Sequence, residues 1–202
     1  MNILFVCTGN TCRSPMAEAL LKAKLSTIEA RSAGIFAGEG EPMSKNTELV
    51  LREWKFDIDH KTSSVTAELL EWADLVLTMT DRHKQTLAIQ YPDYQDKYFT
   101  LKEYVLIDEN QWQKLKELYT KFEEKRSSIL SHTANLSDEE MEEKLLTDLK
   151  SEIKQIEEIE NSIPDINIID PFGGNLDAYR TTRDELDKYI ELLVKRLNGT
   201  SE

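Results

Sequence analysis

The hydrophobic pattern alternates between short apolar runs and longer stretches with helical spacing over most of the chain. Apolar runs with strand character occur at Ile3–Val6, Ile28–Ala33, Asp74–Met79 and Tyr98–Leu101. Helical spacing of apolar residues is found over Pro15–Leu25, Ser44–Trp54, Asp81–Gln90 and Leu176–Leu197. Strands that alternate with helices predict an α/β fold in which a parallel sheet is covered by helices on both faces.

The middle of the chain departs from this alternation and predicts two successive helices. The first is expected over Gln111–Leu130 and the second over Asp138–Asn161, with a turn at Ser131–Asn135 between them. Ser137 followed by Glu140 is a capping-box signature for the start of the second helix. The sequence therefore predicts an α/β domain made of residues 1–107 plus 164–202, with an inserted helical hairpin at residues 108–163.

Charge sharpens this division of the chain. The formal net charge is −13, and residues 108–165 alone contain 16 acidic and 8 basic side chains. An acidic surface repels polyphosphate, which argues against nucleic acid or an anionic membrane as a partner. No stretch approaches the roughly 20 apolar residues that a membrane-spanning helix needs. The insertion is thus expected to be a solvated extension, or an arm that contacts a protein partner or a second subunit.

The cysteine and histidine content favours reduced thiols over disulfides or zinc. The two cysteines, Cys7 and Cys12, are too few for a disulfide framework, and the N-terminal segment lacks the basic region of a signal peptide. We therefore expect the protein to be cytoplasmic. The histidines at positions 60, 83 and 132 are scattered and read as core or surface residues, so no metal site is predicted.

The clearest chemical signal lies between the first predicted strand and the first predicted helix. There, Cys7 is separated by five residues from Arg13, which Ser14 follows. A tight loop before a helix start directs backbone N–H groups at an anion, and Arg can hold two phosphate oxygens. Such an environment stabilises a thiolate, which could attack phosphorus; the competing interpretation is a small buried hydrophobic cysteine. The predicted anion-binding residues are Thr8, Gly9, Asn10, Thr11, Cys12 and Ser14, with Gly9 expected to supply a positive φ and Ser14 a helix cap.

These residues resemble the low-molecular-weight protein tyrosine phosphatase family. The resemblance runs through five segments: Ile3–Glu18, Arg31–Gly34, Ala73–Met79, Phe99–Tyr104 and Asp170–Gly174. It implies a three-layer sandwich with a four-stranded parallel sheet and phosphatase chemistry without metal or cofactor. It also implies Cys7 as nucleophile, Arg13 as phosphate clamp, and Asp170 as general acid and then general base, although an Asp-Pro pair by itself is more typical of a turn. By the same resemblance Asn10 and Ser32 shape the loop and Ser14 stabilises the thiolate.

The substrate is indicated by two departures from typical tyrosine phosphatases of this family. Thr11 replaces a bulky aliphatic residue, and Gly173 follows Phe172 where a second aromatic is usual. This pattern is similar to the bacterial protein-arginine phosphatase branch, since a phosphoguanidinium suits a carboxylate, a small polar neighbour and one aromatic wall. The alternative interpretation is that Thr11 merely replaces one β-branched side chain by another of similar size.

Three other functions stay open at this point. They are a protein-tyrosine phosphatase, an arsenate reductase, which would need cysteines beyond Cys12, and a non-catalytic phosphate-binding module. Phosphorylated proteins are the expected partners of the phosphatase. Cys12 is a packing residue or a redox partner that protects Cys7 by forming a transient disulfide.

Overall fold

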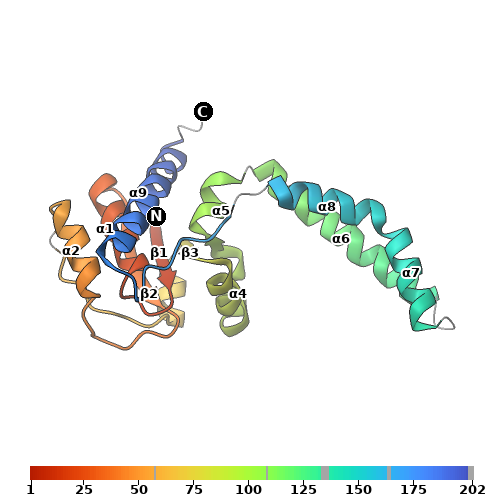
Figure 1. Ribbon diagram of the computed structural model, residues 1–202, viewed down its shortest axis with the longest axis horizontal. Helices are drawn as coiled ribbons and strands as arrows, with labels where there is room; N and C mark the ends of the chain where they lie inside the picture. Colours follow the sequence, from red (N-terminus) through yellow and green to blue (C-terminus); the bar gives the residue numbers. More distant parts are fainter. Residues whose placement is uncertain (57, 108, 133–136, 163–164, 200–202) are drawn as a thin grey trace. The chain divides into compact units, whose positions relative to one another are not determined.

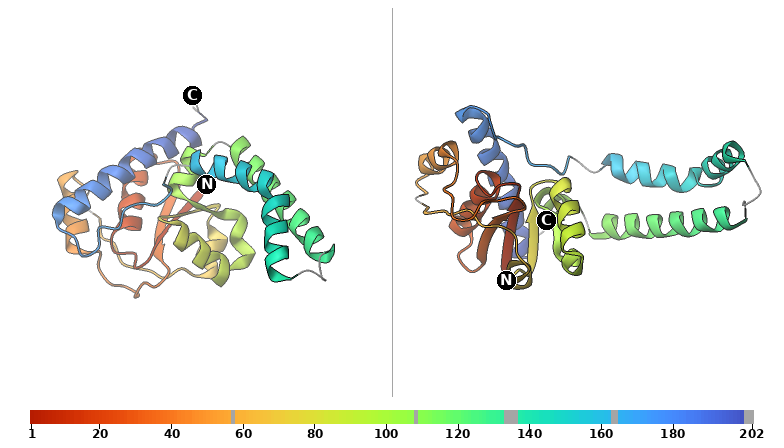
Figure 2. Two further views of the ribbon diagram at one scale, coloured as in Figure 1. Left: turned by 45° about the vertical axis from the view of Figure 1, so that its right-hand side comes forward. Right: turned by 90° about the horizontal axis from the view of Figure 1, so that it is seen from below.

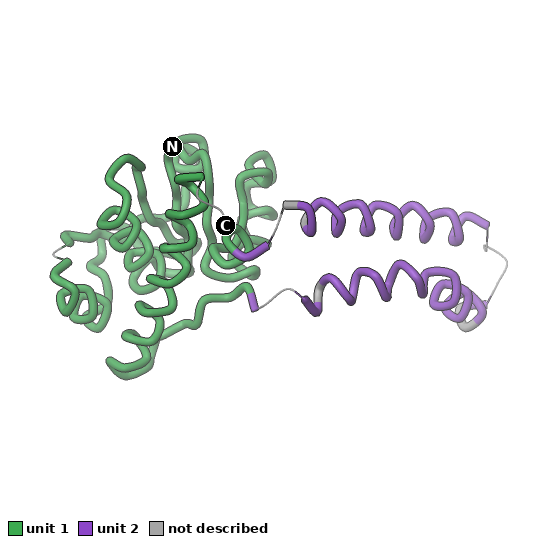
Figure 3. The backbone as a smooth tube through the Cα atoms, turned by 90° about the horizontal axis from the view of Figure 1, so that it is seen from above, with its two compact units in different colours: residues 1–105, 166–202 green, residues 106–165 purple. Residues whose placement is uncertain are grey.

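The computed structural model describes residues 1–56, 58–107, 109–132, 137–162 and 165–199. By its internal contacts the chain divides into unit 1, residues 1–105 and 166–202, and unit 2, residues 106–165 (Figure 3). The predicted boundaries at 108 and 163–164 fall on residues outside this description. That the two segments are separate domains stays a prediction.

Unit 1 is built on a four-stranded parallel sheet with strand order β2-β1-β3-β4 (Figure 1). Its strands are β1 (Asn2–Cys7), β2 (Glu29–Gly34), β3 (Leu75–Thr78) and β4 (Tyr98–Thr100). β1 occupies the interior, pairing Cys7 with Gly34 on one side and Val6 with Thr78 on the other. The predicted α/β class and parallel sheet are confirmed.

Helices cover both faces of this sheet because β1 buries side chains on both. Ile3, Phe5 and Cys7 point to one face, where they join residues of α1 (Arg13–Lys24), α2 (Lys45–Glu53) and α9 (Leu176–Leu197) in one core. Leu4 and Val6 point to the other face and pack with residues of α3 (Ala67–Trp72) and α4 (Asp81–Gln90). Burial on both faces explains why β1 is a continuous apolar run rather than an alternating one.

The elements of unit 1 differ from the sequence prediction mainly in short helices. The predicted α4 and α9 have the observed bounds, whereas α3, α5 (Leu101–Leu106) and the 3-10 helix η1 (Pro92–Lys97) were not predicted. These three helices have six residues each, which is too short for a helical repeat to emerge from the pattern of apolar positions.

Unit 2 consists of α6 (Glu109–His132), α7 (Asp138–Asp148) and α8 (Lys150–Ser162). The chain runs out along α6 and returns along α7 and α8, with α6 and α8 side by side (Figures 1 and 2). Leu115 and Leu118 of α6 pack against Ile156 of α8, so the two apolar stripes bury each other. The Ser137–Glu140 capping box is present.

Two expectations for unit 2 need correction or lie outside the description. The single helix predicted over Asp138–Asn161 is interrupted at Leu149, which ends α7 and is only 3% exposed. The apolar repeat continues through Leu149 and therefore concealed the break. Most of the predicted turn falls on residues 133–136, outside the described residues. None of the helices described in either unit combines the length and apolar character of a membrane span.

Candidate active site

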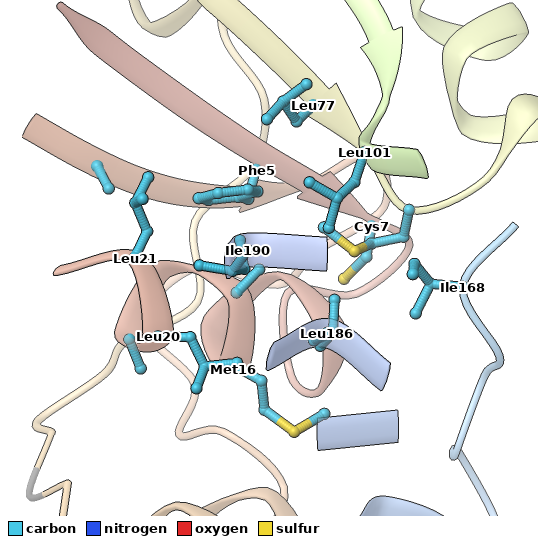
Figure 4. Packing of buried hydrophobic residues seen from close by; sticks show 14 of the residues in the cluster. Phe5, Cys7, Met16, Leu20, Leu21, Leu77, Leu101, Ile168, Leu186 and Ile190 are labelled. Atoms are coloured by element: carbon cyan, nitrogen blue, oxygen red, sulfur yellow. The ribbon is translucent and has the colours of Figure 1, made fainter. Parts of the chain in front are cut away.

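The loop from Cys7 to Arg13 joins the end of β1 to the start of α1. It therefore lies at the carboxyl ends of the strands, where open parallel sheets bind their ligands. The first N–H groups of a helix add positive potential there. The Cys7 side chain is almost fully buried, in the cluster that holds Met16 and Ile168 (Figure 4). Cys7 therefore sits at the base of a loop suited to an anion.

The Asn10 side chain organises this loop from inside. Its Nδ2 donates to the hydroxyls of Ser14 and Ser32, each at 2.9 Å, and its Oδ1 accepts the backbone N–H of Ser63 at 3.0 Å. Asn10 is fully buried and adopts φ +55°, the left-handed conformation. The expectation that Gly9 supplies the positive φ is wrong: Asn10 takes it instead. Asn is one of the few residues other than glycine that adopt this conformation, and the three side-chain hydrogen bonds hold Asn10 in it.

Two polar groups contact the Cys7 sulfur. The Asn10 backbone N–H lies 3.3 Å from Sγ, and the Ser14 Oγ lies 3.0 Å from it. Since Ser14 Oγ already accepts from Asn10, its own proton is available to Cys7 or to the Ala33 carbonyl, 3.4 Å away.

Ser14 does not cap a helix as predicted. The helix begins at Arg13, and its cap residue, Cys12, makes no side-chain capping hydrogen bond. The Ser14 hydroxyl is instead engaged with Cys7 and Asn10. The sequence alone favours Ser14 as the helix cap because proline is common in the first turn of a helix, directly after the cap residue.

Arg13 and Asp170 meet although 157 positions separate them. Arg13 Nη2 lies 2.7 Å from Asp170 Oδ2, and Nη1 donates to the Ile168 carbonyl at 3.4 Å. Arg13 is almost fully buried, whereas half of the Asp170 side chain is exposed. A buried guanidinium beside an accessible carboxyl can bind an anion and exchange a proton at the same place.

The segment before Asp170 is anchored to β3 and to neighbouring helices. The Ile168 N–H donates to the Met79 carbonyl at 2.8 Å, at the end of β3. Lys102 Nζ donates to the Asn167 carbonyl at 2.6 Å, and Glu185 accepts the Ile169 N–H at 3.2 Å. These contacts hold Asp170 at the carboxyl ends of the strands.

The remaining predicted site residues lie on the same loop or on the Asp170 turn. The Thr11 carbonyl accepts from the Ser44 N–H and the Thr47 hydroxyl, which tie the loop to the start of α2. Phe172 is 76% exposed, and its N–H donates to Asp170 Oδ1 at 3.2 Å. An exposed aromatic ring beside the carboxyl is available to a ligand.

Cys12 is nearly as buried as Cys7, and both thiols are free. Its Sγ lies 3.6 Å from Ser44 Oγ and 3.6 Å from the Tyr179 hydroxyl. Burial raises the pKa of Tyr179, so its hydroxyl stays protonated. The redox role of Cys12 stays a prediction.

Sequence reasoning missed several residues that hold the loop. A Cβ on Gly34 would lie 2.7 Å from the Thr8 carbonyl oxygen, so only glycine fits beside the loop. His60 Nε2 donates to the Asn10 carbonyl at 2.9 Å, and Glu18 accepts from Ser32 at 2.6 Å. A lone His or Glu carries no local pattern, because its partners are distant in sequence.

His83 is the fourth such residue. It is buried, and its ring nitrogens lie 2.8 Å from the Thr8 and Thr80 hydroxyls. Burial, reinforced by the positive charges of Arg13 and Arg82 and partly offset by Asp170, lowers the pKa of His83 to about 4. The imidazole is therefore neutral near pH 7.

No metal ion is suggested by the residues that the structure describes, which contain no group of three or more His, Cys, Asp or Glu side chains placed to hold one.

Comparison with known proteins gives closely related matches over nearly the whole chain. The family model described as "Low molecular weight phosphotyrosine protein phosphatase" matches residues 2–155. A protein-arginine-phosphatase of Bacillus subtilis is 36% identical over 201 residues, covering 98% of this chain and 97% of that protein. A tyrosine phosphatase, PtpB of Staphylococcus epidermidis, is 39% identical over 105 residues, which cover 52% of this chain and 74% of PtpB.

Solved structures agree with the sequence matches. The YwlE arginine phosphatase of Geobacillus stearothermophilus superimposes with a TM-score of 0.68 at 34% identity, covering 98% of this chain and 93% of that one. A YwlE arginine phosphatase variant with serine in place of cysteine and a phosphorylated active-site serine gives 0.67 at 35% identity, covering 98% and 96%. The chain therefore belongs to the low-molecular-weight phosphotyrosine protein phosphatase family.

Proposed function

We propose that this protein removes phosphate from phosphoarginine side chains of proteins through a phosphocysteine intermediate on Cys7. The observation that carries the substrate class is that two sequence relatives, matched over 97% and 95% of their own length, are named protein-arginine-phosphatase. Two relatives named protein-arginine-phosphatase match 98% and 96% of this chain, whereas the tyrosine phosphatase PtpB of Staphylococcus epidermidis matches about half. Thr11 and Gly173 support the same choice.

In the first step the Cys7 thiolate attacks the phosphorus atom bound in the loop. The S–P bond forms while the P–N bond to the guanidino group breaks. Arg13 and the loop amides neutralise the charge on the phosphoryl oxygens, which is the main demand of phosphoryl transfer. The Ser14 hydroxyl, 3.0 Å from Sγ, stabilises the thiolate before attack and again when it departs.

Asp170 supplies the proton that the departing nitrogen requires. Arg13 Nη2 lies 2.7 Å from Asp170 Oδ2, beside the anion-binding loop. The acid form of Asp170 passes its proton to nitrogen as the P–N bond breaks.

The second step hydrolyses the phosphocysteine. Asp170, now a carboxylate, takes a proton from water as the water oxygen attacks phosphorus. The S–P bond breaks, inorganic phosphate leaves and the Cys7 thiolate is restored. The phosphorylated active-site serine in the YwlE variant supports a covalent intermediate of this kind.

Discrimination between substrates rests on Thr11 and the Asp170 turn. A phosphoguanidinium is planar and carries several N–H donors, so it suits a small polar residue and a carboxylate. The exposed Phe172 ring offers one stacking face, and Gly173 supplies no second aromatic ring. A phenol leaving group would gain more from a second aromatic and an aliphatic residue at position 11.

The second candidate function is hydrolysis of phosphotyrosine, which the family description favours. The test compares kcat/KM on phosphoarginine and phosphotyrosine peptides for the parent and for Thr11→Ile. We expect the parent to prefer phosphoarginine and Thr11→Ile to shift the ratio toward phosphotyrosine by about tenfold or more, since an unmet hydrogen bond costs about 1–3 kcal/mol. An unchanged ratio would remove Thr11 as the selector.

We expect four further properties of this phosphatase. The protein acts in the cytoplasm, where the Cys7 thiol stays reduced. Cys12, next to Arg13, protects Cys7 by a reversible disulfide under oxidising conditions. Phosphorylated proteins are its substrates. Unit 2 is a solvated helical extension, or an arm that contacts a protein partner or a second subunit.

A further inference from the structure

The most developed polar feature that the reaction above leaves unused is the bridge made by His83. This residue lies in the first turn of α4 and connects two elements. Its Nδ1 lies 2.8 Å from Oγ1 of Thr80, the cap of α4, and its Nε2 lies 2.8 Å from Oγ1 of Thr8, the residue after Cys7. The ring thus ties the Thr8 side chain to the body of unit 1.

One tautomer of this ring satisfies both threonine hydroxyls. Thr80 Oγ1 accepts the His83 backbone N–H at 3.3 Å, as a helix cap does. Among the described residues, Nδ1 is an acceptor within reach of the Thr80 hydroxyl proton, at 2.8 Å from its oxygen. In that arrangement a neutral ring carries its proton on Nε2 and donates it to Thr8 Oγ1.

In this arrangement the Thr8 hydroxyl can still donate one hydrogen bond and accept another. One lone pair of its hydroxyl is used by His83, so the second lone pair and the proton are available to a ligand. Unlike Cys7, Thr8 is exposed. The loop backbone behind it is held, because the Thr8 carbonyl accepts the Phe36 N–H at 2.9 Å.

The bridge stands beside the reacting groups. Thr8 directly follows Cys7 in the chain, and the charges of Arg13 and Asp170 both act on the His83 ring that holds it. A phosphoguanidino group presents P–O acceptors next to N–H donors. A hydroxyl that can donate and accept at once matches that junction, whereas an aryl phosphate has no N–H to offer it.

We propose that Thr8, oriented by His83, is a second specificity contact for substrates with a P–N bond, its hydroxyl accepting from the guanidino N–H. His83 is the positioning residue and Thr8 the contact. The inference rests on the proposed function and adds to it a polar element independent of Thr11.

The test measures kcat/KM on a phosphoarginine peptide and on p-nitrophenyl phosphate for five proteins. They are the parent, Thr8→Val, Thr8→Ser, His83→Leu and the double variant Thr8→Val with His83→Leu. We expect the loss on phosphoarginine to exceed that on p-nitrophenyl phosphate by about tenfold in Thr8→Val and in His83→Leu. Thr8→Ser should restore the parent ratio, and the double variant should lose no more than Thr8→Val, since both changes remove one contact.

A structural readout accompanies the kinetics. Nitrogen-15 NMR of the His83 ring should report the neutral Nε2–H tautomer near pH 7. Thr86→Val is the matched control, because it removes a hydroxyl from α4 that bonds only to the Arg82 carbonyl. It should leave the substrate ratio unchanged.

The outcomes separate this inference from the function on which it rests. A parent without phosphoarginine activity overturns both. A parent that hydrolyses phosphoarginine, with variants that lose activity equally on both substrates, overturns only the specificity role of Thr8. A ring protonated on Nδ1 overturns the positioning role of His83.

Discussion

The two units of this protein differ in what they bury. In unit 2, the buried residues among those described are apolar: Ile107, Leu115, Leu118, Leu149 and Ile156. In contrast, unit 1 contains all of the buried polar and charged residues among those that the structure describes. They include Asn10, Arg13, Ser14, Ser32 and His83. A buried polar group is costly unless its hydrogen bonds are satisfied, so unit 1 has to hold them in fixed geometry.

This difference indicates where the chemistry resides. The buried polar groups of unit 1 form connected chains that end on reactive atoms. One such chain is Ser32–Asn10–Ser14–Cys7, which the partly exposed Glu18 extends at Ser32. Unit 2 buries an apolar seam and adds an ion pair between α6 and α8, Lys125–Glu152, at 2.9 Å. The comparison therefore predicts large effects on turnover from unit 1 and effects on local stability alone from unit 2.

The largest expected effect is that of Cys7→Ser. A hydroxyl at this position is a far poorer nucleophile than a thiolate, so turnover of p-nitrophenyl phosphate should fall by about 10⁴-fold or more. Phosphate binding, measured by calorimetry, should persist because Arg13 and the loop amides are retained. Residual turnover near the parent rate would contradict covalent catalysis.

Next in size is the effect of Leu118→Ala on unit 2. Leu118 is 7% exposed in the seam between α6 and α8, and its truncation should cost about 2–4 kcal/mol. Faster hydrogen exchange of the α6 and α8 amides would report it, while kcat on p-nitrophenyl phosphate stays at the parent value. Leu130→Ala, at a site 38% exposed, is the control with a smaller effect. A parallel loss of activity would argue against the separation of the two units.

A pH effect on unit 1 should follow from the lowered pKa of His83, about 4 in the folded protein against an ordinary value of 6.5. Between these values the unfolded chain binds a proton that the folded protein excludes. Stability from His83 is thus complete above pH 6.5 and declines by about 2–3 kcal/mol as the pH falls to 4.5.

The readout for this effect is the free energy of unfolding in urea at pH 7 and pH 4.5. The drop should be smaller by that amount in His83→Gln, which has no titratable ring, than in the parent. His132→Gln, which changes an exposed histidine of α6, should behave like the parent. An equal fall in the free energy of unfolding in the parent and in His83→Gln would show that folding does not lower the pKa of His83.

The smallest expected effect comes from the largest change, replacement of residues 109–161 by a short linker. Because the site is built entirely from unit 1, kcat/KM on p-nitrophenyl phosphate should stay within about threefold of the parent. A folded deletion protein without this activity would show that unit 2 takes part in catalysis. A selective loss on phosphorylated protein substrates would instead support the interaction arm.

Local patterns were sufficient for much of the fold. The apolar run of β1, the bounds of α4 and α9 and the capping box at Ser137 all depend on residues within a few positions of one another, and the structure has them as predicted. The short helices α3 and α5 escaped prediction, since six residues contain less than two helical turns.

The sequence by itself determined the α/β alternation, the helical character of the insertion and the Cys7–Arg13 loop, because each is written in neighbouring residues. Only the tertiary structure decided that Arg13 meets Asp170, that Asn10 rather than Gly9 takes the left-handed conformation, and that His83 reaches Thr8. Those contacts join residues up to 157 positions apart, and no local pattern encodes them. They exist because a parallel sheet brings the carboxyl ends of its strands, and the loops that follow them, to one edge.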